Sequence, residues 1–435
     1  MGTLWQSLPA NAQDALILVA LLMPAVLIGS VIRRGFAPGP VVGAMMRRHV
    51  WTNAIFALLV AASVATGVGL LAQERALRVA SAQSADKFDL VIAAPGSEIT
   101  MLLATVFLQP SNVALLSGET YDAVASHPRV ALAAPLAFGD SHDGAPVIGT
   151  TAEFVRYLSD DRIDGAMFET YEQAVIGSAV GLEIGDGFEP AHGHGDAAEL
   201  GVHGTILTVT GRKAPTSTPR DRAILVPVEQ VWEAHGMPTG HPIDDPGLGP
   251  PFDPAHFPGT PAIVVHGTSL AGLYALQSQF TRDAESMAFF PGTVLSQLHA
   301  VMGDVRQAMS LLSLVSQMLV ALAILTGLLI LTRLFSRQMA LLRALGAPAR
   351  FVFAVVWSQA ALLLSTGAAL GLMLGFAASA LLSDIVSART DMAVHAALGW
   401  PELHATAAVI ALASVLSLVP ALAVLRQPTV AGLRG

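Results

Sequence analysis

Long apolar stretches that can cross a lipid bilayer constrain this chain more than any other feature. A spanning helix needs roughly 20 predominantly apolar residues. Such tracts cover 15–32, 51–71, 311–331 and a longer region from 351 toward the C-terminus. Charged residues at 383–404 interrupt the last tract, so it divides into spans over 351–382 and 405–425. The sequence therefore predicts five transmembrane helices.

Basic residues set the predicted orientation, because Lys and Arg accumulate in cytoplasmic loops. The loop 33–50, the loop 333–350 and the tail from 426 contain arginines but no Asp or Glu. Placing all three inside gives a consistent alternation of five spans, with the N-terminus outside. The arginines follow the first span and do not precede it, so we interpret it as a retained anchor and not as a signal peptide.

The segment 72–305 must then lie outside the cytoplasm. It contains 28 acidic and 11 basic residues, a formal charge of −17. That charge argues against nucleic-acid binding, which requires basic residues to neutralise phosphates. The chain has no cysteine, so no disulfide can hold this domain. A segment of this length can bury an adequate core without one.

Within this segment the residue pattern predicts an α+β domain. The helix-favouring runs 72–85 and 295–310 extend the neighbouring spans as stalks. The Pro- and Gly-rich run 236–261 predicts an irregular surface loop. Strands are predicted over Phe88–Ala93, Val130–Pro135, Thr205–Thr210 and Ala262–His266, and helices over Thr151–Leu158, Val228–Ala234 and Leu270–Asp283.

The predicted fold is an α-helical membrane protein with an inserted α+β extracytoplasmic domain. Its predicted parts are an N-terminal span with a basic loop, a second span, the outer domain with its stalks, and a final part with three spans. These parts cover 1–50, 51–71, 72–305 and 306–435.

The loop after the third span carries the most specific motif. Residues 337–347 read RQMALLRALGA, a short basic amphipathic helix that Gly346 and Pro348 would end. It resembles the cytoplasmic R-E-x-x-L-L-R-A-L-G-A element of FtsX-like, MacB-type ABC permeases, with Gln338 in place of Glu. Residues 174–186 are similar to the outer-domain pattern of that family. Residues 426–434 are similar to its P-x-x-A-L-R tail, with one extra residue.

This resemblance covers roughly 51–435, and it implies a homodimeric permease that works with a separate cytoplasmic ATPase, which would bind ATP and magnesium. The helix within 333–350 would lie in a groove of that ATPase. Arg337 and Arg343 would pair with acidic groups, Leu341, Leu342 and Leu345 would fill the groove, and Gly346 would end the helix. A basic helix between two spans could also be only a charge anchor.

The chain itself is not expected to hydrolyse ATP or to contain a catalytic residue. A P-loop needs Lys followed by Ser or Thr. The two lysines of the chain, Lys87 and Lys213, are followed by Phe88 and Ala214. The ATPase must therefore be another polypeptide.

The three C-terminal spans 311–331, 351–382 and 405–425 contain no charged residue and no histidine. Because ionisable groups usually mark a path for ions or polar substrates, their absence argues against such a path. It suits mechanotransmission, the mechanism that the family resemblance implies. We expect an inner-membrane protein with its large domain in the periplasm.

Export or extraction of a substrate is the expected role, with a periplasmic adaptor or substrate-binding protein as a further partner. Two alternatives stay open. One is a metal-linked export or homeostasis system, and the other is a signal transducer that activates a periplasmic partner without transport.

Three glycines, Gly367, Gly371 and Gly375, recur at four-residue spacing in the fourth span. Small residues on one helix face allow close approach of another helix. Packing within one subunit and a homodimer seam are both compatible with this pattern.

The histidines are concentrated in the outer segment. Ten of thirteen lie within 72–305, and six of these lie within 192–256. Imidazole and carboxylate groups are ligands for zinc. A candidate zinc site is therefore predicted at His192, His194, Asp196 and His203. The spacing matches no strict metal-binding motif, so a solvated acidic loop with incidental histidines is the alternative.

Overall fold

The computed structural model describes residues 5–109, 111–193, 204–244, 247–301, 318, 322, 326–327, 336–390, 394 and 396–425. The chain divides into two compact units. The helical unit comprises Met1–Ala76, Val305–Asp384 and His395–Gly435, and the sheet unit comprises Leu77–Asp304 and Ile385–Val394.

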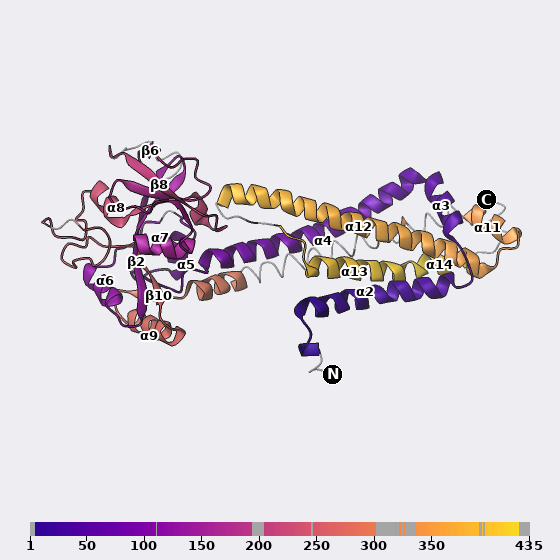
Figure 1. The fold of residues 1–435 in the computed structure, drawn as a ribbon. Coiled ribbons are helices and arrows are strands. Elements are labelled where there is room, and N and C mark those ends of the chain that lie inside the picture. The colour runs from indigo at the N-terminus through magenta and orange to yellow at the C-terminus, as the bar shows by residue number, and fades with distance from the viewer. Residues whose placement is uncertain are drawn as a thin grey trace. The chain divides into compact units, whose positions relative to one another are not determined.

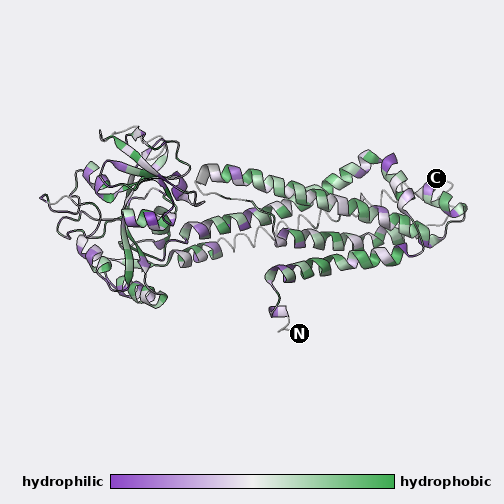
Figure 2. Cartoon of the chain, in the orientation of Figure 1, coloured by the Kyte–Doolittle hydropathy of each residue, from purple (hydrophilic) through white to green (hydrophobic). Residues whose placement is uncertain are grey.

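The helical unit is built from long apolar helices, which Figure 2 shows as mostly hydrophobic. Its elements are α2 (Ala10–Arg33), α3 (Gly39–Arg48), α4 (Val50–Ala85), α11 (Ser336–Ala344), α12 (Ala349–Thr390), α13 (Trp400–Leu416) and α14 (Leu418–Leu425) (Figure 1). Stretches long and apolar enough to cross a membrane are Ala10–Arg33, Val50–Ala85, Ala349–Ser387 and Trp400–Ala423. They correspond to four predicted spans. The fifth, 311–331, lies almost wholly outside the described residues.

Both α4 and α12 are longer than the spans predicted for them. The polar run 72–85 continues α4 without a break, as the sequence predicts. The predicted end of the fourth span at 382 is not the end of its helix, because α12 runs on to Thr390 through Asp384 and Arg389. These charges end the apolar pattern but not the backbone hydrogen bonding, since a helix satisfies its own N–H and C=O groups whatever its side chains.

The predicted glycine face packs α12 against α4. A Cβ atom added at Gly371 would lie 2.6 Å from Val64 Cβ and 2.7 Å from the carbonyl oxygen of Ala61, below the 3.0 Å that Cβ atoms keep from other atoms. Added Cβ atoms at Gly367 and Gly375 would likewise approach α4 to 2.7 Å. These glycines therefore serve packing within the chain. A homodimer stays a prediction, and its interface would have to use other faces of these helices.

A buried carboxylate joins α4 to the start of α13 in the helical unit. The Glu402 side chain is 0% exposed, and its Oε1 accepts a hydrogen bond from Arg75 Nε at 3.3 Å. Its Oε2 accepts from the backbone N–H of Gly399 at 2.9 Å, which caps α13. Since a buried charge requires a partner, this pair fixes where α13 begins relative to α4.

One mixed sheet forms the framework of the other unit. Its order is β11-β1-β10-β2-β3-β9-β5-β8-β4, with β6 on β8 and β7 on β2. The pairs β3–β9 and β5–β8 are parallel, and the other pairs are antiparallel. All four predicted strands are present. The strands are β1 (Leu90–Ala93), β2 (Val130–His142), β3 (Ala145–Thr150), β4 (Ile163–Gly165), β5 (Gln173–Ile176), β6 (Gly187–Phe188), β7 (Ala191–His192), β8 (Leu207–Lys213), β9 (Ile224–Pro227), β10 (Ala262–Gly267) and β11 (Met287–Phe289).

Helices cover both faces of this sheet, because alternate strand residues point to opposite sides. Leu90 and Ile92 of β1 belong to one core cluster with residues of α6 (Gly118–Ala125), α8 (Val228–Ala234) and α9 (Leu270–Thr281). Val91 and Ala93 pack with α5 (Glu98–Thr105) and α7 (Ala152–Ser159), and Ala85 at the end of α4 belongs to this second cluster. A short 3₁₀ turn, η2, covers Pro219–Arg222. The three predicted helices correspond to α7, α8 and α9.

The Pro- and Gly-rich run 236–261 is irregular where described, as predicted, but it is not only a surface loop. Phe252 and Phe257 are 6% and 7% exposed. Their rings pack on Trp232 of α8, with centroids 5.5 Å and 4.9 Å away. The many proline and glycine residues explain why this run has no regular secondary structure. Part of the run is nevertheless buried, because its two aromatic rings bury large apolar areas.

The glycine contact predicts a selective loss of stability. Gly371→Ala should destabilise the helical unit by about 1–3 kcal/mol, because an inserted methyl group forces α12 away from α4. Gly43→Ala is the matched control. A Cβ atom at Gly43 in α3 would meet nothing within 4 Å, so the change should be neutral or slightly stabilising. Thermal unfolding of the full chain in detergent measures both, and equal melting temperatures would contradict the assigned contact.

Candidate coupling helix and histidine cluster

The predicted coupling segment forms the helix α11, which ends in a Schellman motif. The backbone N–H of Gly346 donates to Arg343 O at 3.1 Å, and that of Ala347 donates to Leu342 O at 3.0 Å. Gly346 has φ of 96°, the left-handed conformation that this motif requires and glycine adopts without strain. The helix therefore stops where the sequence predicts.

One side of α11 is held by the helical unit and another is exposed. Met339 and Ala340 are 2% and 6% exposed, and Met339 packs in a cluster with Val42 of α3 and Trp357 of α12. Leu341 and Leu345, four residues apart and hence on one face, are 51% and 78% exposed. Such an apolar face on an anchored helix is suited to binding a partner.

The other predicted coupling residues are placed differently. Leu342 is half-buried and packs against the cluster of Met339, so it contributes to anchoring α11 and not to the exposed face. Arg343 is half-buried. The side chain of Arg337 lies outside the described residues.

Positive charge dominates the end of the helical unit where α3 and α11 lie (Figure 1). Arg47 and Arg48 end α3, and Arg343 lies in the last turn of α11. The sequence has no Asp or Glu within 15–73 or 305–383. An acidic partner surface would complement this end.

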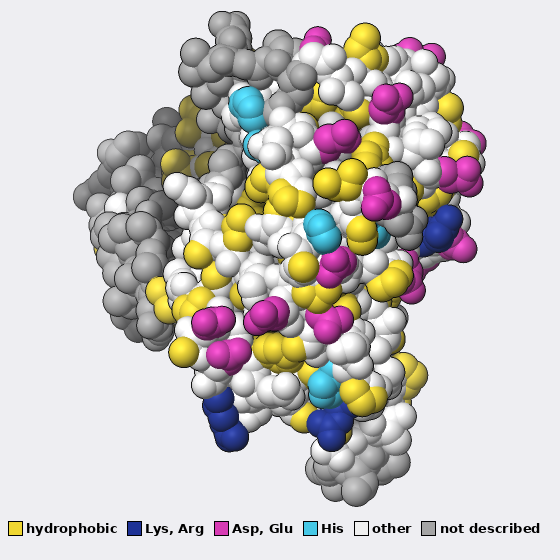
Figure 3. All heavy atoms as spheres, turned by 90° about the vertical axis from the view of Figure 1, so that its left-hand side faces the viewer, with side chains coloured by type: hydrophobic (Ala, Val, Ile, Leu, Met, Phe, Trp, Pro, Cys, Tyr) yellow, Lys and Arg dark blue, Asp and Glu magenta, His cyan; other side chains and the backbone are white. Residues whose placement is uncertain are grey.

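The sheet unit shows the opposite charge on its surface. In the view of Figure 3, acidic side chains are spread over the face, Lys and Arg are few, and histidines lie among them. This agrees with the formal charge of −17 over 72–305. Such a surface attracts cations and repels anions.

One histidine of the predicted zinc site lies in a cluster with two groups that the prediction did not include. His192 Nδ1 lies 3.1 Å from Asp140 Oδ1, and His235 Nε2 lies 3.7 Å from the same oxygen. The two imidazole rings are inclined by 66° to each other, with centroids 4.8 Å apart. The other three predicted ligands, His194, Asp196 and His203, lie outside the described residues.

Tertiary structure brings this cluster together from three separate segments. Asp140 and His192 face each other across the antiparallel pair β2–β7, so their side chains share one side of the sheet. A bulge at Gly139 shifts the register just before Asp140. His235 is the C-cap residue of α8. No local spacing in the sequence signals this arrangement, because it depends on the pairing of the two-residue strand β7.

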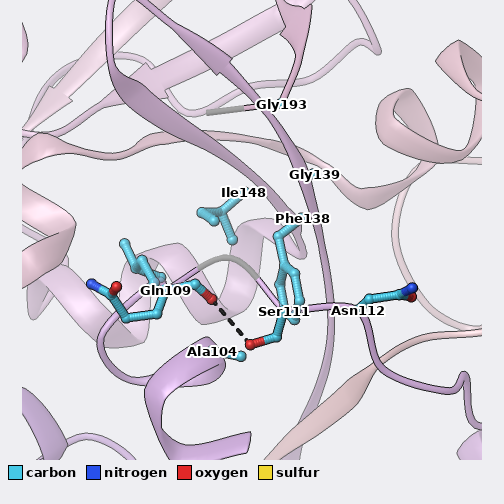
Figure 4. A pocket seen from close by; sticks show the side chains of 9 residues that line it. Ala104, Gln109, Ser111, Asn112, Phe138, Gly139, Ile148 and Gly193 are labelled. Atoms are coloured by element: carbon cyan, nitrogen blue, oxygen red, sulfur yellow. Dashed lines mark hydrogen bonds between the residues drawn. The ribbon is translucent and has the colours of Figure 1, made fainter. Parts of the chain in front are cut away.

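A pocket of about 390 Å³ is lined in part by residues that adjoin the histidine cluster in the sequence, although none of the three clustered residues lines it. Its lining includes Gly139 and Gly193, the neighbours of Asp140 and His192. Figure 4 shows Phe138 and Ile148 projecting from β2 and β3 toward the segment that carries Gln109 and Ser111. The lining is largely apolar and neutral, with amides and a hydroxyl as polar groups.

A buried carboxylate lies on the same helix as His235. Glu229 in the first turn of α8 is 1% exposed, and its Oε1 accepts a hydrogen bond from the backbone N–H of Gly249. Burial raises the pKa of Glu229 to about 7, because its charged form loses the solvation of water. The ring of His241 lies nearby, with Nε2 3.6 Å from Oε1.

Comparisons with known proteins give one family match, and it lies in the C-terminal part of the chain. Residues 310–429 match the family described as FtsX-like permease C-terminal. The matched range contains the motif at 337–347. The periplasmic region of MacB from Actinobacillus actinomycetemcomitans aligns with 49% of this chain and 95% of its own, at 9% identity and a TM-score of 0.31. The extracellular domain of the noncanonic ABC-type transporter YknZ from Gram-positive bacteria aligns with 46% of this chain and 98% of its own, at 11% identity and a TM-score of 0.26. No protein of curated function matches the sequence.

The raised pKa of Glu229 predicts a pH-dependent stability. Since the folded pKa of Glu229, about 7, exceeds the ordinary glutamate value of 4.5, the folded state binds the proton more tightly, and stability falls as pH rises through this window. Glu229→Gln keeps the acceptor for Gly249 and removes the charge. It should therefore stabilise the sheet unit at pH 8, by on the order of 3 kcal/mol, and change little at pH 4.5. Thermal unfolding at both pH values measures the difference, and an equal gain at both would contradict the assignment.

Proposed function

We propose that this chain, an FtsX-like permease in its residues 310–429, is the membrane subunit of an ATP-driven ABC system. In this proposal a separate cytoplasmic ATPase hydrolyses ATP, and the permease relays the resulting motion to its outer domain. The observation that carries the proposal is α11, an anchored helix that presents Leu341 and Leu345 to solvent beside arginines.

The surface of α11 has the chemistry of a docking helix. Leu341 and Leu345 fill an apolar groove of the ATPase, and the surrounding arginines, among them Arg343, face acidic groups at its rim. Helix-in-groove recognition uses apolar side chains at such i, i+4 spacing. Met339 and Ala340 keep α11 attached to α3 and α12, so displacement of α11 displaces the helices on which it packs.

The helix α4 supplies the connection from membrane to outer domain. Its 36 residues correspond to about 54 Å, well beyond the ~30 Å hydrocarbon core of a bilayer. It has no break, and Ala85 at its end is buried in a core cluster of the sheet unit. A tilt or shift of its apolar part therefore acts on the sheet through a continuous hydrogen-bonded rod.

Neither lysine is positioned to serve nucleotide phosphates. Lys213 is 1% exposed, and its Nζ donates to Asp221. Lys87 pairs with Asp160 and lies 4.9 Å from the ring centroid of Tyr157. These contacts support the proposal that a different polypeptide provides ATP hydrolysis.

The proposed setting is the inner membrane, with the acidic sheet unit in the periplasm and α3 and α11 in the cytoplasm. The basic loops and the acidic domain support this orientation. The proposed task is export or extraction of a substrate from the periplasm or outer leaflet, by two copies of the chain with two ATPase subunits and a periplasmic adaptor or substrate-binding protein. The helices act as a transmission and not as a substrate path.

A double substitution on α11 tests the coupling proposal. Leu341→Ser with Leu345→Ser should weaken binding of the proposed partner ATPase by at least about 30-fold. The reason is that fully burying one leucine contributes about 1.5–3 kcal/mol, and the double variant removes two leucines that docking would bury in part. Co-purification from detergent-solubilised membranes, followed by titration of the purified subunits, measures the loss.

The control is Leu398→Ser, which replaces a leucine of comparable exposure, 44%, in the segment before α13. It should leave ATPase binding unchanged, and both proteins should keep the melting temperature of the wild type. Undiminished ATPase binding by the double variant would refute the docking role of α11. ATPase activity that only a periplasmic protein stimulates, and no transported substrate, would favour signalling over export.

A further inference from the structure

Asp140 needs a cationic or hydrogen-bonding partner, because its carboxylate is only 2% exposed. Two imidazoles face it, one from β7 and one from the end of α8. The arrangement differs from the pair of His256 with Asp253, in which a single ring contacts a single carboxylate. Two rings that converge on one buried oxygen form a candidate three-ligand site.

The tautomer of His235 determines which of its ring nitrogens can bind a cation. His235 Nδ1 lies 2.7 Å from the carbonyl oxygen of Val231, which can only accept, so Nδ1 carries the proton. In the neutral ring, Nε2 then points a lone pair toward Asp140 Oδ1 at 3.7 Å. Two acceptors that face each other repel unless a proton or a metal cation lies between them, and a metal cation can bind both. A backbone carbonyl that holds the second nitrogen is also the arrangement that orients metal-binding histidines.

The backbone around Asp140 and His192 is held firmly enough to form such a site. The N–H of Gly193 donates to Gly139 O at 2.9 Å, and Ser141 Oγ donates to Gly193 O at 2.5 Å. Gly139 has φ of 151°, in the region that glycine tolerates, and it forms the bulge that turns Asp140 toward β7. The carboxylate and the first imidazole are thus positioned by the main chain.

The distances fit one metal ion. Zinc binds nitrogen and oxygen ligands at 2.0–2.2 Å, which separates tetrahedral ligand atoms by about 3.3 Å. Here the ligand atoms of Asp140, His192 and His235 all lie within 4.8 Å of one another. Only small side-chain rotations are needed to close them around an ion, and the negative charge of the domain favours its entry.

We propose that Asp140, His192 and His235 bind one divalent transition-metal ion, with zinc as the best-fitting metal. The set of two imidazoles and one carboxylate matches zinc or copper and not magnesium or calcium, which prefer oxygen ligands alone. Three protein ligands leave one coordination position to water or an exchangeable ligand, as in open zinc sites. The ion joins α8 to the β2–β7 pair, and Asp140 and His192 are the chain neighbours of Gly139 and Gly193, which Figure 4 labels in the pocket wall. This inference is independent of ATPase coupling.

The test uses the full chain in detergent, freed of metal by a chelator. Isothermal titration with zinc should give one high-affinity ion per chain. Titration with cobalt should give the visible absorption of a four- or five-coordinate Co²⁺ centre. His235→Ala and Asp140→Asn should each weaken zinc binding by more than about 100-fold, since loss of an outer-shell partner alone costs 10–100-fold.

His256→Ala is the matched control, because it removes a histidine that pairs with a carboxylate elsewhere in the same unit. It should bind zinc as the wild type does. His235→Gln checks folding, since it should lose zinc binding but keep the melting temperature of the metal-free wild type. The proposal is overturned if the wild type binds no zinc, or if His235→Ala binds it normally while a His194→Ala/His203→Ala variant does not.

Discussion

Close contact between α12 and α4 at Gly367, Gly371 and Gly375 is the interaction on which the helical unit depends. Lipid tails are as apolar as leucine side chains, so apolar helices in a bilayer gain little from burying apolar surface against each other. They gain from dispersion contacts, which require backbones to come close. Glycine permits that approach, and the valines of α4 fill the space that absent side chains leave. Outside this apolar zone, the ion pair between Arg75 and the buried Glu402 holds α4 to the start of α13.

Continuity of α4 connects this packing to the sheet unit. The helix that carries the valines ends at Ala85, inside the cluster formed by one face of the sheet, α5 and α7. The opposite face carries α8, and α8 presents His235 to Asp140. The proposed relay and the proposed metal site therefore belong to opposite faces of one sheet. Residues of β2 connect them, since Leu132, Ala134 and Leu136 pack with α5 and α7 while Asp140 lies further along the same strand.

Elements with a strong local pattern could be predicted from the sequence. Apolar length identified the helices α2, α4, α12 and α13, alternation and β-branched residues identified β1 and β10, and the RQMALLRALGA motif located α11 with its glycine stop. Predictions were weaker where a local signal and tertiary burial disagree. Phe252 and Phe257 are buried in a run whose composition indicates a surface loop, and α12 passes through charges that end an apolar pattern. Leu342 turned inward and Leu345 outward, although both fit one amphipathic motif.

The sequence by itself determined the long apolar helices, their charge asymmetry and the resemblance of the C-terminal part to FtsX-like permeases, because these follow from composition and spacing along the chain. Only the tertiary structure decided which side chains meet. His192 was singled out with neighbours in the chain, but it lies against Asp140 and His235, which are 52 and 43 residues away. That meeting depends on a glycine bulge, a two-residue strand and the end of α8, none of which a linear pattern can bring together. Distances between side chains are set by strand pairing and helix packing, and so is the chemistry that the sheet unit can perform.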